Sequence, residues 1–201
     1  MRLFTASVFF TMYSTFCYCK DDLSERSSED QRKIADAKKL LGGNDTLFLV
    51  SSENAWYQGR YICWSSIKTG NVKDGYSHNI TYYVTEPNST GTPELVSRYA
   101  IWYASMWGRN PTITLQADRQ RQPVIRKDYT LVEAEASCLV VGLIRDKPRD
   151  TMCLYFMAKK SIKKNHTRCK NAYKTNCKVA TGVKYRWRRH CNRQNRPKLK
   201  K

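Results

Sequence analysis

Cysteine is the residue type in this 201-residue chain with the clearest capacity for covalent chemistry. Two cysteines, Cys17 and Cys19, end an uncharged stretch that follows Met1-Arg2, and the other six lie further along: Cys63, Cys138, Cys153, Cys169, Cys177 and Cys191. An even number in an exported chain predicts three disulfides and leaves the pairing open. The competing use is zinc, but no Cys-x-x-Cys pair occurs and the three histidines are scattered, so we expect no metal and no cofactor.

The other reactive side chains do not assemble a recognisable catalytic site. His78, His166 and His190 have no nucleophile at a characteristic spacing, and there is no glycine-rich phosphate loop or zinc-protease motif. Glu133 and Glu135 could suggest glycoside hydrolysis, but two carboxylates on one strand are weak evidence for it. We therefore expect a binding protein and not an enzyme.

The first 19 residues have the features of a secretory signal peptide. A positive start precedes the uncharged segment 3–19, which is short and rich in Ser and Thr, and the chain becomes polar at Lys20; the alternative is an N-terminal anchor. Four N-glycosylation sequons agree with secretion, at Asn44, Asn79, Asn88 and Asn165. We expect an extracellular glycoprotein.

Hydrophobic periodicity predicts the elements that position these residues. A helix begins with a cap at Ser27 or Ser28 and ends at Gly42-Gly43. Short apolar runs of strand character follow, near Leu47 and over residues 57–64, 79–85, 99–107, 112–116, 129–144 and 152–157, with breakers such as Gly70-Asn71 between them. A second helix is expected over 161–177, with an irregular loop as the alternative. Seven or eight strands without interleaved helices indicate an antiparallel sandwich or barrel.

Positive charge is concentrated at the C-terminal end. Residues 151–201 hold 17 of the 36 Lys and Arg residues and none of the 17 Asp and Glu residues, so the first 150 residues are nearly neutral. We expect a signal peptide over 1–19, one domain over 20–182 and a basic tail over 183–201 that Cys191 attaches to the domain.

The cysteine spacing, with its neighbouring residues, resembles that of the tick salivary lipocalins of the histamine-binding family. The matching segments are Cys138-Leu-Val-Val, Cys153-Leu-Tyr-Phe and Cys169-x3-Tyr173-x3-Cys177, together with the N-terminal helix and the terminal Cys191. The resemblance implies an all-β, eight-stranded antiparallel barrel with a helix at each end of the chain. It also implies three disulfides, Cys63–Cys191, Cys138–Cys169 and Cys153–Cys177.

The resemblance further implies a monomer in saliva that sequesters a host mediator, such as histamine or serotonin, in its cavity and so counters host defence. Amine-binding members carry an Asp and a Glu at positions that Leu139 and Cys153 occupy here, and Tyr155 replaces a Trp. If Leu139 faces the lumen, a period of two would place Glu133 and Glu135 there as substitute counter-ions; the alternative is that both face solvent.

The alternative ligand is an acidic lipid of the leukotriene or thromboxane type, which an apolar cavity favours. Arg60 or Arg98 could bind its carboxylate, and the aromatic candidates for the wall, each of which could instead be ordinary core, are Trp56, Trp64, Trp102, Tyr103 and Trp107.

The basic tail suggests a different class of partner. Lys184, Arg186, Arg188 and Arg189 alternate with aromatic residues, a pattern that suits polyanions. In an exported protein, a glycosaminoglycan or anionic phospholipid is expected before nucleic acid. The alternative is a solvated tail without a partner.

Overall fold

The computed structural model describes residues 27–53, 61–84, 93–118, 126–143, 152–177, 184–186 and 191. Within these ranges no helix has the length and hydrophobicity needed to span a membrane. Several predicted features lie outside the described residues: the signal peptide over 1–19, Trp56, Arg60, the Asn88 sequon, Arg188 and Arg189.

The first helix, α1, covers Ser28–Leu41 and begins where the capping pattern predicts. The hydroxyl oxygen of Ser27 accepts a hydrogen bond from the backbone N–H of Asp30 at 3.1 Å, which satisfies one of the free donors of the first turn. The helix ends at Gly42, and its buried residues, Ala37, Leu40 and Leu41, all lie in its second half. These three side chains point into the main hydrophobic core.

Eight antiparallel strands form a closed barrel, as the sequence analysis predicts. They are β1 (Leu47–Glu53), β2 (Tyr61–Val72), β3 (Gly75–Val84), β4 (Glu94–Trp107), β5 (Asn110–Ala117), β6 (Arg126–Glu135), β7 (Cys138–Leu143) and β8 (Met152–Ala158). Each strand from β2 to β8 pairs with the next, and β1 pairs with both β8 and β2, which closes the sheet. This closure leaves no free edge between the eight strands.

Two predicted strand boundaries differ from the structure. The run 129–144 divides into β6 and β7 at a tight turn over Ala136 and Ser137. Conversely, Gly70-Asn71 does not break the chain but lies inside β2, where the pairing with β3 shifts in register; the turn falls at Lys73 and Asp74. Asp74 has a φ of 61°, a left-handed conformation that Asp tolerates better than most residues.

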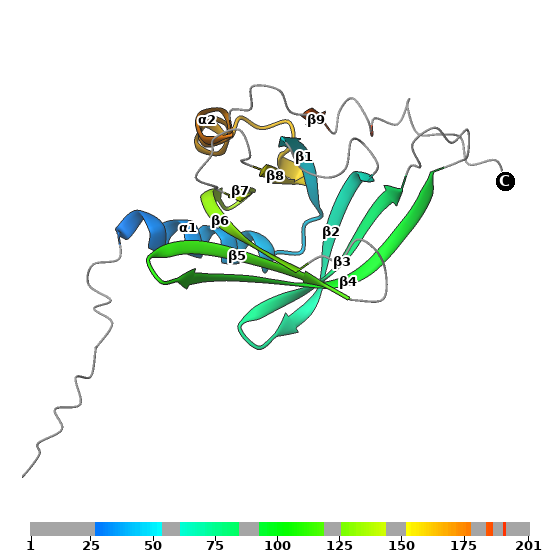
Figure 1. Ribbon diagram of the computed structural model, residues 1–201, viewed down its shortest axis with the longest axis horizontal. Coiled ribbons are helices and arrows are strands. Elements are labelled where there is room, and N and C mark those ends of the chain that lie inside the picture. The colour runs from blue at the N-terminus through cyan, green and yellow to red at the C-terminus, as the bar shows by residue number, and fades with distance from the viewer. Residues whose placement is uncertain are drawn as a thin grey trace, which may run out of the picture.

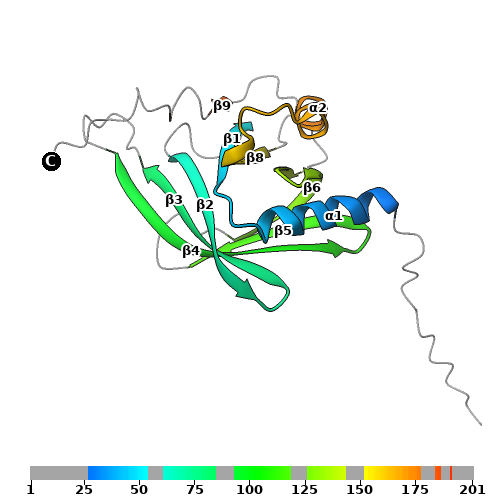
Figure 2. The same cartoon turned by 180° about the vertical axis from the view of Figure 1, so that it is seen from behind.

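Side chains alternate between two separate cores along the strands. The inward core takes alternate residues of the barrel strands, for example Leu154, Phe156 and Ala158 of β8, together with α1. The intervening residues of β8, Cys153, Tyr155 and Met157, belong to a second core beneath the C-terminal helix. Figures 1 and 2 show α1 on one side of β6 and this helix, α2, on the other.

The second helix is shorter than the sequence predicts. A short 3-10 helix over Lys159–Ser161 ends where the predicted helix was expected to begin, and α2 covers only Thr167–Asn176. His166 explains the late start, because its buried ring bonds the carbonyl oxygen of Ser161 at 2.8 Å and the hydroxyl of Ser137 at 3.2 Å and so holds a turn ahead of the helix. Cys169, Tyr173 and Cys177 then face the barrel on one side of α2, as predicted.

The three disulfides are the pairs that the family resemblance implies. Cys138–Cys169 and Cys153–Cys177 fasten α2 to β7 and β8, and Cys63–Cys191 joins the tail to β2. A short ninth strand, β9 (Lys184–Arg186), pairs with the end of β1, a contact that the basic composition of the tail did not suggest.

Candidate ligand-binding site

The inner wall of the barrel is apolar and rich in aromatic rings. Trp64 of β2 and Tyr82 of β3 stack with ring centroids 4.5 Å apart, and Trp102 of β4 meets Phe156 of β8 edge to face at 5.5 Å. All four side chains are buried in the inward core. Such walls suit a ligand whose surface is largely apolar or aromatic.

A chain of hydrogen bonds crosses this wall where α1 ends. Trp102 Nε1 donates to the Ser66 hydroxyl at 3.2 Å, Ser66 contacts His78 Nδ1 at 2.9 Å, and His78 Nε2 lies 2.9 Å from the carbonyl oxygen of Leu41. Because a carbonyl can only accept, Nε2 carries the proton and Nδ1 accepts from Ser66. Burial is the main cause that lowers the pKa of His78 to about 4, so the ring is neutral near pH 7.

One ion pair lies on the described part of the inner wall. Arg98 falls on the same side of β4 as the core residues Val96, Ala100 and Trp102. Its side chain is fully buried, and its Nε donates to Asp118 Oδ1 at 3.0 Å. Arg98 lies four residues from Trp102, which is about 13 Å along a strand. The pair therefore puts charge on the inner wall two residues along β4 from Ala100, the cross-strand partner of His78.

Tyr129 contributes a hydroxyl to the same interior. The residue is fully buried in the inward core, and its hydroxyl has no hydrogen-bond partner among the residues that the structure describes. Burial raises the pKa of this phenol, so it stays protonated. A buried hydroxyl without a partner is costly unless another molecule satisfies it, and a polar atom of a ligand could do so.

The predicted ligand residues divide between the two faces of the barrel wall. Leu139, Trp64, Trp102 and Arg98 point inward. The prediction that Tyr103 and Tyr155 contact a ligand inside the barrel is corrected here. Each tyrosine follows an inward residue and therefore points outward. Tyr155 packs beneath α2, with its ring 5.5 Å from that of Tyr173, and burial raises its pKa to about 12. Neither tyrosine lies on the inner wall.

Glu133 and Glu135 do not face the lumen. The prediction that they serve as substitute counter-ions for an amine is therefore corrected as well. Glu135 points toward α2, where Arg168 Nε donates to it at 3.1 Å and His166 lies 3.8 Å away. Glu133 is buried against α1, and Arg32 donates to its carboxylate at 2.7 Å. This contact is the main cause that raises the pKa of Arg32. Both carboxylates already neutralise cations of the protein.

The reason lies in the turn between β6 and β7. Counting every second residue back from Leu139 treats positions 133–139 as one strand, but a two-residue turn interrupts them. Across the resulting hairpin Leu139 pairs with Ala134, and Cys138 pairs with Glu135. Since cross-strand partners share a face, Ala134 accompanies Leu139 inward while Glu135 joins Cys138 on the outside.

Sequence reasoning missed several inward residues that now define the wall: Ser66, His78, Tyr82, Tyr129 and Phe156. A period of two was present in β3, where His78, Ile80 and Tyr82 alternate with exposed or half-exposed residues. That signal identifies a shared face, but it does not reveal whether the face points inward. The hydrogen bond to Leu41 could not be found from the sequence, because its partners are 37 residues apart.

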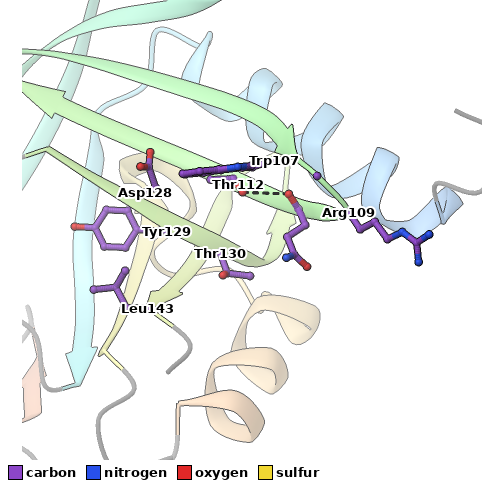
Figure 3. Close-up of a pocket in the computed structure, with 9 residues that line it drawn as sticks. Trp107, Arg109, Thr112, Asp128, Tyr129, Thr130 and Leu143 are labelled. Carbon is purple, nitrogen blue, oxygen red and sulfur yellow. Dashed lines mark hydrogen bonds between the residues drawn. The ribbon is translucent and has the colours of Figure 1, made fainter. Parts of the chain in front are cut away.

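A separate pocket with a volume of about 530 Å³ lies beside the turn between β4 and β5. Figure 3 shows the indole of Trp107 over Thr112, with Thr130 and Asp128 nearby and Arg109 pointing away. Trp107 is 67% exposed. Thr112, Asp128 and Thr130 occupy the strand positions that alternate with the inward residues Ile113 and Tyr129. Tyr129 and Leu143 also line the pocket, so it is formed by residues from both faces of the wall. Trp107 is therefore not a residue of the barrel interior.

Comparison with known proteins identifies one matching family and several solved structures with a similar fold. The family described as "Tick histamine binding protein" matches residues 25–193. No curated protein sequence matches the chain. Japanin from Rhipicephalus appendiculatus, solved bound to cholesterol, is similar with a TM-score of 0.55 and 13% identity, over 76% of this chain and 98% of that one. Lobster apocrustacyanin A1 gives a TM-score of 0.46 and 14% identity, over 80% and 84%.

Proposed function

Because this chain belongs to the tick histamine-binding protein family, whose members are ligand-binding lipocalins, we propose that it is secreted in saliva and holds a small host mediator inside its barrel. Sequestration removes the mediator without transforming it, so the protein needs an enclosing wall and no catalytic group. The ligand class then depends on which groups the wall presents.

The composition of the inner wall favours an apolar or amphipathic lipid over a cationic amine. A buried ammonium group needs carboxylates to offset its lost hydration. Glu133 and Glu135 point elsewhere, and Asp118, the carboxylate found near the described inner wall, is paired with Arg98. Stacked and edge-on aromatic rings instead offer apolar surface. This distribution of charge is the observation that carries the proposal.

Two inner groups could bind the polar end of such a lipid. Arg98 is paired with Asp118, so a ligand carboxylate would have to share its guanidinium with that residue, whereas the Tyr129 hydroxyl is suited to an alcohol or an acid. Japanin, whose fold is similar, is bound to cholesterol in its crystal structure, so a barrel of this kind can hold a lipid. An acidic lipid would share Arg98 with Asp118, whereas a sterol would need only the Tyr129 hydroxyl.

A biogenic amine is the second candidate, because the family is named for histamine and aromatic faces attract cations. Titration of the secreted protein with a leukotriene, cholesterol, histamine and serotonin, followed by tryptophan fluorescence, separates these classes. We expect saturable quenching by a lipid and a flat response to both amines. Saturable binding of an amine alone would overturn the lipid assignment while leaving sequestration in place.

The basic tail supports a separate proposal, that the protein also binds an extracellular polyanion. The residues concerned are Lys184, Arg186, Arg188 and Arg189, whose side chains lie outside the described part of the structure. We expect salt-dependent retention on heparin that decreases when all four are replaced by Gln. Unchanged retention would contradict the proposal.

A further inference from the structure

The outer face of β2, β3 and β4 carries an unusual group of exposed hydrophobic side chains. Four large hydrophobic residues are exposed in the described part of the chain, and three of them lie here: Ile67 (46% exposed), Leu95 (57%) and Tyr99 (50%). Exposed apolar side chains gathered on one sheet face favour association unless something covers them.

Asn79 lies at the centre of this face. In the strand pairing, Asn79 of β3 is directly opposite Ile67 of β2 on one side and Tyr99 of β4 on the other. Directly opposite side chains have Cβ atoms about 5 Å apart, so both are within reach of anything attached to Asn79. We call the four residues Ile67, Asn79, Leu95 and Tyr99 the Asn79 face.

The sequence around Asn79 indicates which group covers this face. Asn79-Ile80-Thr81 is an N-glycosylation sequon, and the Asn79 side chain is exposed. Its Oδ1 accepts a hydrogen bond from the Ser97 hydroxyl at 2.8 Å, which leaves Nδ2 to carry a substituent. Ile80, the middle residue of the sequon, points into the barrel core. The sequon therefore lies within strand β3 and not in a loop.

We propose that the N-linked glycan of Asn79 lies over Ile67 and Tyr99 and keeps this face of the barrel from associating with other molecules. The new bond joins Nδ2 to the first sugar of a lipid-linked oligosaccharide diphosphate; the amide loses a proton and the lipid diphosphate leaves. The apolar face of a sugar ring packs against the phenol ring of Tyr99 and the side chain of Ile67. The proposal rests on secretion, but not on the identity of the barrel ligand.

The other described sequons provide the contrast. Asn44 follows α1 and Asn165 precedes α2, and both are exposed. Neither is paired in a sheet with an exposed hydrophobic residue. A glycan there adds solubility without covering a defined patch, so Asn165→Gln is a matched control for Asn79→Gln.

The test uses the full chain secreted from a eukaryotic host. Peptide mass spectrometry after enzymatic deglycosylation in ¹⁸O water reports which asparagines carried sugar. Retention on a hydrophobic-interaction column and sedimentation velocity then compare wild type, Asn79→Gln and Asn165→Gln. We expect Asn79 to be occupied, and Asn79→Gln alone to show longer retention and self-association. Adding Ile67→Thr and Tyr99→Thr to Asn79→Gln should restore wild-type behaviour. Deglycosylation of the folded wild-type protein provides the same comparison if the variant is not secreted.

Two results would overturn the proposal. One is an unmodified Asn79 in a protein whose Asn165 carries sugar; the other is equal retention for Asn79→Gln and Asn165→Gln when both sites are occupied in the wild type. If no sequon is modified, the glycan proposal fails, whereas secretion is judged separately by recovery of the protein from the medium. Ligand capture is judged separately, because these measurements report on the outer surface alone.

Discussion

The Nε2 atom of His78 lies 2.9 Å from the carbonyl oxygen of Leu41, so a side chain of the inner barrel wall is bonded to the last residue of α1. Together with the apolar contacts of Leu40 and Leu41, this bond fixes the helix to the barrel. The His78 ring is also hydrogen-bonded to Ser66, and Ser66 is bonded to Trp102. One chain of hydrogen bonds therefore connects the end of the helix to the inner wall.

This connection predicts a specific dependence of stability on pH. Burial lowers the pKa of His78 from 6.5 to about 4, so between these values the unfolded state binds the proton and the folded state does not. The contribution of His78 is therefore complete above pH 6.5 and is lost as the pH falls toward 4, by about 3 kcal/mol in total. Urea unfolding of wild type and His78→Gln at several pH values in this window should show the difference between them shrinking by that amount.

Carboxylates titrate in the same range in both proteins, so only the difference between wild type and variant is informative. A difference in unfolding free energy that stays constant with pH would mean that His78 takes up its proton in the folded state. The hydrogen bond that Nδ1 accepts from Ser66 would then be lost, because both ring nitrogens of a charged histidine are donors.

The Arg32–Glu133 pair predicts a structural role where the sequence suggested a ligand contact. Arg32 also donates to the carbonyl oxygen of Ala134 at 2.9 Å, so it attaches α1 to the end of β6 at two points. Since Arg32 is 30% exposed, a double-mutant cycle with Arg32→Met and Glu133→Gln should give a coupling of only about 1 kcal/mol.

Glu135→Ala extends the same test to ligand binding. Its carboxylate contacts Arg168 of α2 on the outer face, so the substitution should leave the affinity for any barrel ligand unchanged and lower stability slightly. A loss of amine affinity of tenfold or more, without loss of stability, would show that this carboxylate reaches the lumen after all.

The disulfides predict a graded loss of stability. Cys63 and Cys191 are 128 residues apart in sequence, against 24 for Cys153 and Cys177. If the bonds act mainly on the unfolded chain, removing them costs about 5 and about 3.5 kcal/mol respectively. Denaturant unfolding of the two double Cys→Ala variants measures both. The opposite order would indicate that native contacts around α2, and not loop length, dominate.

Local signals were sufficient for much of this fold. The Ser27 cap and the Gly42 stop determine α1 through neighbouring residues, and both were found. The alternation of apolar and polar residues located the strands, because it too depends only on neighbouring residues. The division of 129–144 was missed, because the short turn at Ala136 and Ser137 contains no Gly or Pro and the apolar run continues on both sides.

The candidate site depended on contacts that local patterns do not contain. Whether Glu135 faces the lumen follows from its pairing with Cys138 across the hairpin, and the partner of Glu133 lies 101 residues away in α1. Leu139 and Trp102 lie inside, as apolar strand residues tend to do. For charged residues, orientation depends on a distant partner, which the sequence alone does not reveal.

The central claim, that the ligand occupies the barrel interior, is tested most directly by filling that interior. Ala104 points inward on β4 and is buried, whereas the next residue, Ser105, points outward and is exposed. Ala104→Leu adds volume inside and Ser105→Leu adds the same group outside, each in a Trp107→Phe background that removes an exposed indole from the fluorescence signal. The account predicts that Ala104→Leu weakens binding of the captured lipid at least about tenfold, or 1.4 kcal/mol, while Ser105→Leu leaves it unchanged. Equal affinity in the two folded variants would contradict capture inside the barrel.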